Sequence, residues 1–596
     1  MKRTIITTIL SMLLVLCLVC FAACGTTAST TTAKQNAAGD ADTNSMPGRP
    51  GGDPGAGGDP GTNNTGTVDT NFDPVTEATL AADAEESAVE ITGEFAIATE
   101  DGAYEQNGSV YTVTAAGEYV LTGVLADGQI VVAAGDDDKV TLTLSGVFIT
   151  CTTDSPILVN NADKIKIKVA EGTYNVVTDA RAKQTDENDA TGKAAIYAAC
   201  DMDVLGSGAL VVTAGYNNGI QTKDDLEIKN VTLKVTAPNN AIKGNDSLTI
   251  KSGDIIAVST GGDALKTDNS DVSSKGNQRG TITISGGNLT LYAACDGIDA
   301  AYDVVITGTP NITVNTYTYS DYTVKSHMEA DDDSYKGIKA DNTISIGGGV
   351  IVINAKDDAV HANNDVTLEN GESPLGNVTV TAGSLTIVSG DDGIHADGTL
   401  QIDGGYIDVV NAVEGLEAHY VNVAGGEIHV YATDDGVNAQ GSTKYTSDGV
   451  ITVSGGKLYV EVQGRDVDGI DSNGNYVQTG GFVMVCNYNA DQSGNMSAVD
   501  TDGTVSITGG TIIALGIVPS SGGAGGPGGR PGGRTGMGGM GASSVPSGAV
   551  IFSSTLAAGS HTFTCGDVSE TFTLRKSVSA GWIWSEGITS GNYTLQ

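Results

Sequence analysis

The sequence has few aromatic and few basic residues. Aromatic residues make up 5% of the 596-residue chain, against 82 glycines, a balance that suits many tight turns around a slim core. Lys and Arg total 30 whereas Asp and Glu total 72, which gives a net charge of −42. So acidic a chain argues against nucleic acid as a partner, because phosphates would be repelled, and it favours metal cations as the counter-charge.

Several familiar signatures are also missing. The chain contains no GxSxG, no phosphate-binding loop and no HExxH, so no serine-hydrolase elbow, nucleotide site or zincin is indicated. It has eight Cys, and beyond the N-terminal segment their number is odd and none of them forms a CxxC pair. We therefore expect no disulfide framework and mostly small buried thiols. The five concerned are Cys151, Cys200, Cys295, Cys486 and Cys565.

The N-terminal segment carries processing signals. A basic start, Met1–Arg3, precedes an apolar run over Ile5–Phe21, and the small residues before Cys24 resemble a bacterial lipobox. We predict a lipoprotein signal peptide over 1–24 with lipidation of Cys24; an uncleaved anchor or an ordinary secretory signal is the alternative. Residues 25–75 are rich in Thr, Asn, Gly, Asp and Pro, cannot bury a core, and are predicted to form a disordered tether.

A short phrase recurs through the middle of the chain on a step of about 22 residues. It reads Asp-Gly-Ile-x-Ala or a close variant, and two β-rich runs separated by Gly-Gly follow it. The longer steps look like the same unit plus a loop, as at 366–378, 440–449 and Tyr317–Tyr335. A period of this length indicates a solenoid. The apolar residue of the phrase serves as a marker, and the markers are Ile196, Ile220, Ile242, Leu265, Ile298, Ile338, Val360, Ile394, Leu416, Val437, Ile470 and Val499.

Each repeat unit predicts short strands and tight turns. Alternation over Thr399–Ile402 and again over Tyr406–Val410 indicates half-buried strands, and the intervening Gly404-Gly405 pair permits the turn. One unit cannot bury its apolar face alone, whereas stacked units can, at a step of about 4.8 Å per coil. The sequence therefore predicts an all-β fold, a parallel β-helix over residues 76–520 built of coils of about 22 residues.

The two ends of the repeat region are less regular. Val110–Val177 lacks the Asp-Gly phrase but keeps short alternating runs, so we interpret it as the first coils, with a separate small sandwich as the alternative. Residues 521–545 form a Gly-rich loop that contains Arg, and strand-like runs over 546–596 predict a small β cap on the open end. A sugar-stacking platform made by Trp582 and Trp584 is the alternative for that last segment.

Acidic residues recur at fixed places around the marker. Stacking would bring Asp392, Glu414, Asp435 and Asp468, each two residues before its marker, into one run of carboxylates about 4.8 Å apart. Like charges at that distance repel by about 1 kcal/mol per pair even in water. A bound Ca²⁺ would turn the repulsion into attraction, because it takes about 6–8 oxygen ligands in irregular geometry. The predicted calcium ligands are Asp263, Asp268, Asp296, Asp299, Asp392, Asp397, Glu414, Glu417, Asp435, Asp468 and Asp471.

Two alternatives bear on these positions. Asp-Gly is also good turn chemistry, so a solvated turn is the simpler interpretation of any one acid. His361 and His395 follow their markers on adjacent coils, and no Cys or other His completes a zinc set, so we expect a stacked, solvated ladder. Lys336 and Lys339 interrupt the acids midway, which predicts separate calcium clusters and not one continuous line.

In combination these motifs resemble a known family. Residues 115–150 and 216–228 and the repeated DGI-x-A units look like bacterial carbohydrate-binding-domain proteins, whose founder comes from a cellulolytic clostridium and binds cellulose and polygalacturonate. The resemblance covers roughly residues 90–520. It implies a right-handed parallel β-helix, bound calcium ions and affinity for acidic plant polysaccharide, and it includes a similarity of fold to calcium-dependent pectate lyases.

The expected function follows from the resemblance and the charge. We expect a non-catalytic, monomeric protein on the extracellular face of the membrane, attached only through its N-terminal lipid, that binds polygalacturonate or cellulose. Calcium would bridge the acidic protein and the acidic polymer. One rival is a calcium-dependent lyase with Lys266 or Lys339 as the base, although neighbouring acids would raise the pKa of such a lysine. Another is a surface adhesin or structural lipoprotein that recognises protein or host glycan.

Overall fold

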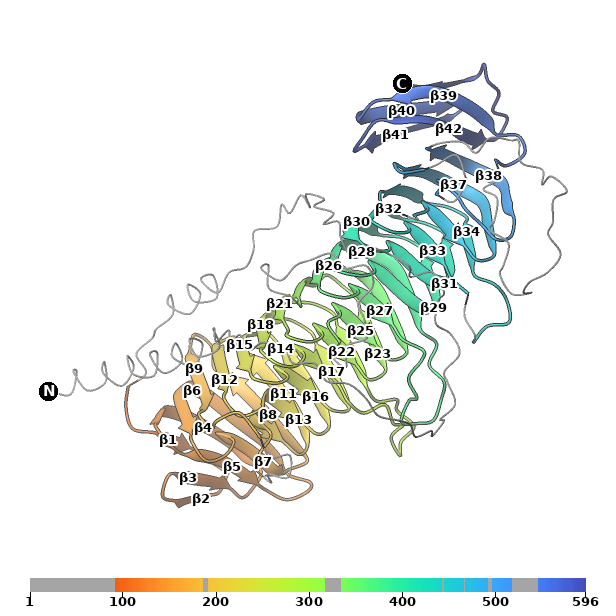
Figure 1. Cartoon of the computed structure of the whole chain (residues 1–596). Helices are drawn as coiled ribbons and strands as arrows, with labels where there is room; N and C mark the ends of the chain where they lie inside the picture. The colour runs from red at the N-terminus through yellow and green to blue at the C-terminus, as the bar shows by residue number, and fades with distance from the viewer. Residues whose placement is uncertain are drawn as a thin grey trace, which may run out of the picture. The chain divides into compact units, whose positions relative to one another are not determined.

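The computed structural model describes residues 92–185, 191–316, 334–441, 444–465, 467–490, 496–516 and 545–596. Every regular element in these ranges is a strand, from β1 (Ala96–Ala98) to β43 (Tyr593–Leu595), which confirms the all-β prediction (Figure 1). Within them no helix is long and apolar enough to cross a membrane. The predicted signal peptide, Cys24, the tether and residues 521–544 of the Gly-rich loop lie outside the described residues.

The strands that carry the markers form one parallel ladder, here called the marker ladder. Each marker is the register partner of the next, from Ile196 with Ile220 to Ile470 with Val499, so the predicted repeat register is confirmed. The strands are β3 (Val110–Val113), β5 (Gln129–Ala133), β7 (Ile157–Asn161), β10 (Ala194–Ala198), β13 (Asn218–Thr222), β16 (Ile242–Gly244), β19 (Leu265–Lys266), β22 (Ile298–Ala300), β25 (Ile338–Ala340), β27 (Val360–Ala362), β29 (Ile394–Ile402), β31 (Leu416–Val423), β33 (Val437–Ala439) and β36 (Ile470–Ser472).

Two further parallel ladders run beside it, and long strands turn a corner from one into the other. One passes through β4 (Gly117–Leu125), β6 (Lys139–Cys151), β8 (Lys164–Val169), β11 (Asp201–Gly206), β14 (Asp225–Lys229), β17 (Ser247–Ile250), β20 (Thr281–Ile284), β23 (Asp303–Ile306), β26 (Thr343–Ala355), β28 (Asn377–Ser389), β34 (Val450–Val453), β37 (Asn475–Asn487) and β38 (Val505–Leu515). The other adds β9 (Tyr174–Asp179), β12 (Ala209–Ala214), β15 (Val231–Ala237), β18 (Gly253–Ser259), β21 (Asn288–Tyr292), β24 (Asn311–Asn315), β30 (Tyr406–Ala412), β32 (Glu427–Ala432) and β35 (Lys457–Val462).

The first coils belong to the same stack. Ile130 pairs with Ile157, and Ile157 pairs in turn with the first marker, Ile196. Residues 110–177 therefore continue the marker ladder, and the alternative of a separate sandwich is wrong. The winding is solenoid-like, with three strand positions in each coil, while the right hand of the winding stays a prediction.

Alternation of side chains decides what faces the core. In β16, β25, β27 and β33 the first and third residues are buried and the middle one is not, because successive side chains of a strand point to opposite faces. The marker Ile394 is 0% exposed, as is Ile338. The residue after each marker is thereby held on the outer surface at one coil spacing from its equivalents, and this surface carries the candidate site.

The glycine pairs at the corners are needed for close stacking. Gly405 has a φ of +89°, in the left-handed region that other residues rarely adopt. At Gly425 an added Cβ would lie 2.2 Å from the carbonyl oxygen of Asp403 in the preceding coil. Larger residues at these corners would force neighbouring coils apart.

Antiparallel strands close both ends of the stack. At the start β1 pairs with β4 and β2 (Tyr104–Asn107) with β3. At the end β42 (Val578–Ser585) pairs antiparallel with β38 and with β39 (Val550–Leu556), and β40 (Gly559–Cys565), β41 (Val568–Leu574) and β43 form a separate small sheet. Trp582 is 6% exposed and packs into the core, so its ring is not available for sugar stacking.

Candidate functional site

The residues two positions before the markers form a hydrogen-bonded ladder. The backbone N–H of Asn240 donates to Asn218 Oδ1 (3.0 Å), that of Asp263 to Asn240 Oδ1 (2.9 Å), and that of Asp296 to Asp263 Oδ1 (2.9 Å). The pattern recurs where Asp392 donates to Asp358 Oδ1 (3.1 Å) and Asp468 to Asp435 Oδ1 (2.6 Å). Each side chain thus supplies the acceptor that a corner N–H of the next coil would otherwise lack.

This structural role was not predicted from the sequence, where the acids two positions before the markers were assigned to calcium. Asn218 and Asn240 occupy the same position and could have indicated the role, because an amide oxygen accepts the same bond without a charge. In Asp263, Asp358 and Asp435 one oxygen is therefore committed to the backbone, and the second oxygen is left to meet a cation.

In the coils of Asp263 and Asp299 the chain provides that cation itself. Lys266 Nζ lies 3.1 Å from Asp263 Oδ2 and also pairs with Asp299, while Lys339 Nζ lies 3.7 Å from Asp299 Oδ1 and 3.9 Å from Asp296 Oδ2. Burial works to raise the pKa of Asp299, but the two lysines outweigh it and lower that pKa below its usual value. The structure thus brings three predicted ligands together beside two ammonium groups, which leaves one carboxylate in excess. Burial, followed by the charge of Asp299, raises the pKa of Asp296 to about 7.

Asp268 does not join this group. Its side chain is 41% exposed and pairs with Lys243 one coil earlier. It therefore lies apart from the other predicted ligands and has its own counter-ion.

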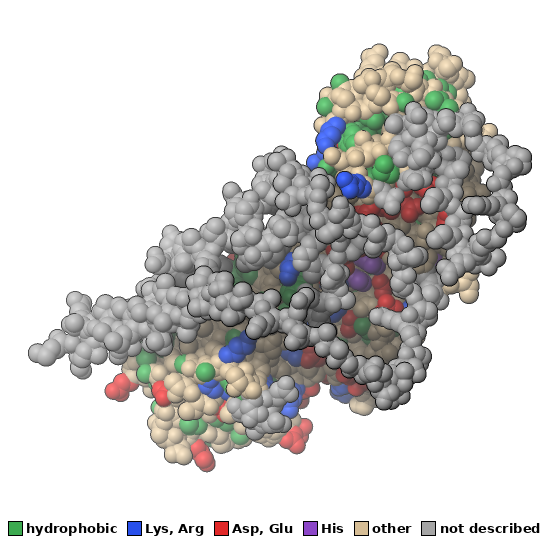
Figure 2. All heavy atoms as spheres, in the orientation of Figure 1, with side chains coloured by type: hydrophobic (Ala, Val, Ile, Leu, Met, Phe, Trp, Pro, Cys, Tyr) green, Lys and Arg blue, Asp and Glu red, His purple; other side chains and the backbone are tan. Residues whose placement is uncertain are grey.

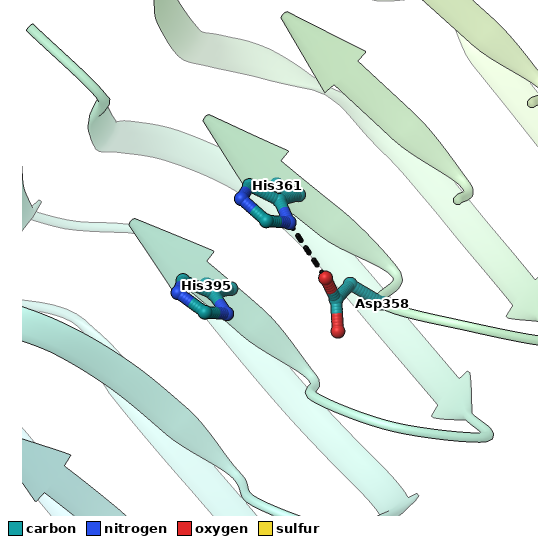
Figure 3. A group of neighbouring side chains, drawn as sticks. All are labelled: Asp358, His361 and His395. Atoms are coloured by element: carbon teal, nitrogen blue, oxygen red, sulfur yellow. Dashed lines mark hydrogen bonds and ion pairs between the residues drawn. The ribbon is translucent and has the colours of Figure 1, made fainter. Parts of the chain in front are cut away.

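The next coils use histidine. His361 Nδ1 lies 2.6 Å from Asp358 Oδ2 (Figure 3). His395 Nδ1 lies 2.9 Å from Asp392 Oδ2, and both Nε2 atoms lie 3.3 Å from Asp397 Oδ1. The rings stack with centroids 4.4 Å apart and planes 6° apart, so the predicted stack is confirmed. The expectation of solvation is wrong, since the side chains are 14% and 20% exposed and carboxylates flank them on both edges.

Electrostatics match this arrangement. Burial alone would lower the pKa of His395, but Glu417 and the bonded Asp392 and Asp397 raise it well above 6.5. Conversely, although burial raises it, the two imidazoles lower the pKa of Asp397 far below its usual value. The raised pKa of His395 favours its cationic form, at the place that lysines occupy in the earlier coils.

From the coil of His395 onward the carboxylates outnumber the cations, since Asp392 and Glu417 share His395. Asp392, Glu414 and Glu417 are 4%, 7% and 4% exposed, and Asp392 Oδ1 is buried without a hydrogen-bond partner. Burial, followed by the charge of Asp392, raises the pKa of Glu414 to about 7 and that of Glu417 well above its usual value. Ligand atoms of Asp392, His395 and Glu417 all lie within 4.8 Å of one another. Asn438 donates from Nδ2 to Glu414 Oε2 (2.9 Å).

The excess of acid continues through the next two coils. Burial and neighbouring carboxylates raise the pKa of Asp468 to about 7 and that of Asp471 to about 6. The pKa of Asp435 is raised well above its usual value, first by burial and then by Asp471 and Glu414. Among the described residues, no Lys, Arg or His forms an ion pair with Glu414, Asp435, Asp468 or Asp471. Figure 2 shows His side chains beside Asp and Glu side chains on this face.

The predicted ligands thus fall into two sets that differ in charge balance. Asp263, Asp268, Asp296, Asp299 and Asp397 already face cations of the chain. A second set, here called the uncompensated cluster, consists of Asp392, Glu414, Glu417, Asp435, Asp468 and Asp471. Asp392 and Glu417 share the single cation of His395, and the other four have no ion pair among the described residues. Its orphaned Asp392 Oδ1 and its dense carboxylates fit a hard divalent cation, which prefers oxygen ligands and tolerates irregular geometry.

Comparison with known proteins gives a family match over most of the chain. A family model described as carbohydrate-binding domain-containing protein matches residues 107–377 and 379–517. A curated protein of the same description from Acetivibrio thermocellus is 42% identical over 125 residues, which cover 20% of this chain and 44% of the relative. The match thus spans less than half the length of that relative.

A solved structure shares sequence with part of the chain. It is described as "Structure of the polysaccharide lyase-like protein from C. thermocellum, Gadolinium derivative". It is 35% identical, and the match covers 36% of this chain and 84% of that one, with a TM-score of 0.33.

Proposed function

Because this chain belongs to the family of carbohydrate-binding domain-containing proteins, we propose that it is a non-catalytic, cell-surface protein that binds acidic polysaccharide through calcium. The ion is held by the uncompensated cluster. The fold that we propose for it is the right-handed parallel β-helix, with the lipid on Cys24 attaching a monomeric protein to the extracellular face of the membrane. Polygalacturonate is the preferred ligand, and cellulose is a second one.

One observation carries the calcium proposal. Asp392 Oδ1 is buried without a partner at the point where the lysines and histidines of the site end. Earlier coils pair Asp299 with Lys266 and Lys339, and Asp358 with His361. His395 meets only Oδ2 of Asp392, which leaves Oδ1 without a partner. An unpaired buried carboxylate oxygen costs free energy, and a divalent cation would remove that cost for several carboxylates at once.

Calcium also reconciles the charges of protein and ligand. The chain carries a net charge of −42, so a polyuronate would be repelled by most of its surface. A calcium ion held by three or four carboxylates keeps coordination positions for uronate oxygens and water. Bound in this way, the ion inverts the local charge and gives an anionic sugar a place to attach.

The lyase alternative is less well supported. A lysine base needs a pKa near the working pH, and thus a pKa below its ordinary value. Burial would lower the pKa of Lys266, but Asp299 and Asp263 raise it above its ordinary value, and Lys339 is raised in the same way by Asp299 and Asp296. Both lysines serve as counter-ions of buried carboxylates, which favours a structural role over that of a catalytic base.

The experiment compares calcium binding with polysaccharide binding. Asp392→Asn combined with Glu417→Gln should abolish the rise in melting temperature that calcium gives the wild-type chain, and should abolish retention on insoluble pectate. Asp403→Asn is the matched control, because Asp403 lies exposed at a corner turn and only accepts a bond from Gln401. At about 100-fold excess over the dissociation constant, calcium should stabilise the wild type by about 2.7 kcal/mol.

The opposite results would contradict the proposal. If calcium leaves the melting temperature of the wild type unchanged and gives no heat of binding, the calcium site is wrong. Retention on pectate that is indifferent to chelator would remove the bridging role. Unsaturated uronide released from polygalacturonate, and lost in Lys266→Ala, would establish the lyase instead.

A further inference from the structure

A polar groove of about 860 Å³ lies on the same outer face, several coils before the uncompensated cluster. It crosses β7, β10, β13 and β16, whose residues Leu158, Tyr197, Gln221 and Lys243 are register partners in successive coils. Its size falls within the range of about 300–1,000 Å³ that is typical of pockets for small ligands. Lys and Arg side chains are visible over the region of β8 to β16 in Figure 2.

The groove concentrates cations that are scarce elsewhere. Lys193, Lys223, Lys243 and Arg279 all line it, in a chain with only 30 basic residues. Three of them are engaged: Lys243 pairs with Asp268, Arg279 Nε lies 2.7 Å from Asp246 Oδ2, and Lys193 also has an interaction partner. Lys223 is exposed and, among the described residues, forms no ion pair or hydrogen bond through its side chain.

The acids of the groove are mostly occupied. Asp154 accepts a bond from the backbone N–H of Gly192 (2.8 Å) and lies 3.7 Å from Arg181, while Asp246 and Asp268 face the cations just named. Burial, followed by the charge of Asp246, raises the pKa of Asp224 above its usual value. Three of the four carboxylates that line the groove thus already have partners, and Lys223 is left to meet an anionic ligand.

The remaining lining suits a sugar. Asn160, Gln221 and Asn245 offer amide donors and acceptors, which match hydroxyl groups that both give and take hydrogen bonds. Gln221 already accepts from Asn218 through Oε1, which leaves its NH₂ to donate. Tyr197 is half-buried, and its side chain combines an apolar ring with a hydroxyl group that can hydrogen-bond to a sugar. The coil step of about 4.8 Å is close to the length of one sugar unit in a linear chain.

We propose that this groove binds an acidic oligosaccharide directly, without calcium, with Lys223 contacting a uronate carboxylate and Tyr197 contacting a sugar ring. This inference rests on the proposed function and adds a second binding place to it. Segments of the polysaccharide that are bound in the groove and at the uncompensated cluster would contact the same face of the protein. A long polyuronate could then meet the protein at two places, and its avidity would exceed either contact alone.

The test uses the full chain, an oligogalacturonate and a neutral cello-oligosaccharide of the same length, and titration calorimetry in excess EDTA. Lys223→Gln and Tyr197→Ala should each weaken oligogalacturonate binding at least tenfold. Lys229→Gln is the matched control, because Lys229 is an exposed lysine of β14 that does not line the groove, and it should bind as the wild type does. The melting temperatures of all variants show whether Tyr197→Ala has disturbed the fold. Lys223→Gln should leave the melting temperature unchanged, because Lys223 is exposed.

Other results would contradict the groove proposal, the contact with Lys223 or the proposed function separately. If the wild type binds oligogalacturonate only with calcium, or if Lys223→Gln binds as tightly as the wild type in EDTA, the groove proposal is wrong while the proposed function stands. Equal affinity for the neutral oligosaccharide would overturn the carboxylate contact with Lys223. If neither sugar binds with or without calcium, the proposed function itself fails.

Discussion

Asn and Asp are interchangeable at one position of this repeat because the fold needs only an oxygen there. At the position two before the marker, Asn218 and Asn240 hold the next coil's N–H in the same way as Asp263 and Asp358. The negative charge is an addition to this role. Where it occurs, the second oxygen attracts Lys266 or His361, and where no such residue follows, the acid belongs to the cluster that we propose binds calcium.

This dual role predicts a difference between two substitutions at Asn240. Asn240→Ala removes the acceptor of the buried Asp263 N–H and should lower the free energy of unfolding by about 1–3 kcal/mol. Asn240→Asp keeps the acceptor and should cost clearly less, the cost being its repulsion from Asp263. Urea unfolding midpoints measure both. Equal destabilisation by the two variants would show that the side-chain oxygen is not what the coil needs.

The sequence revealed less at this scale than at any other. It indicated which acids would gather, but not that Lys266 would reach Asp299, 33 residues further on, nor that Asp397 would close the outer edge of both histidines. Such contacts depend on the rotamers of long side chains across coils, which spacing does not encode. Asp268 has the same type and spacing as true cluster members, yet it turns outward to Lys243.

At the scale of strands and turns the sequence was far more informative. Period-two alternation places Ile394 inside and His395 outside without further assumptions, and a repeat of constant length forces the markers into register. Hydrophobic burial is non-directional and needs only the correct face. The pairing of Ile130 with Ile157 was harder to foresee, because the early coils lack the Asp-Gly phrase, but their strand pattern still indicated it.

The same reasoning predicts that a marker residue contributes much more to the free energy of unfolding than an exposed isoleucine does. Ile394→Ala should lower the free energy of unfolding by about 2–5 kcal/mol, because it leaves a cavity in a core where the side chain is 0% exposed. Ile551→Ala, at a residue that is 57% exposed, should change it by less than about 0.5 kcal/mol. Denaturant unfolding of both variants is the measurement. Comparable losses would mean that the marker ladder is not the core of the stack.

For the whole chain, the governing fact is that 72 acidic residues share 30 basic ones. The structure shows that the shortage is not spread evenly. From Asp263 to Asp397 the acids of the candidate site meet lysines and histidines, whereas from Glu414 to Asp471 they meet one another. Like charges held at one coil spacing raise the free energy of the folded chain, so this part of the stack should depend most on solution conditions.

That dependence has a definite sign. Burial and neighbouring acids raise the pKa of Glu414 and Asp468 to about 7 and that of Asp471 to about 6, against about 4 in an unfolded chain. The folded state therefore binds more protons than the unfolded state between about pH 4 and 7, and its stability falls as pH rises through that window. His395, whose pKa is raised well above 6.5, acts in the same direction at higher pH.

Calcium should reverse this trend, because it binds the deprotonated carboxylates and replaces the protons that are lost. In EDTA we expect the melting temperature to fall between pH 5 and pH 8. With calcium in excess the fall should shrink or disappear, so that the stabilisation by calcium is small at pH 5 and large at pH 8. In Asp392→Asn combined with Glu417→Gln, both the fall in EDTA and the effect of calcium should be reduced. A wild-type melting temperature that rises with pH in EDTA would contradict the repulsion from which the calcium site was argued.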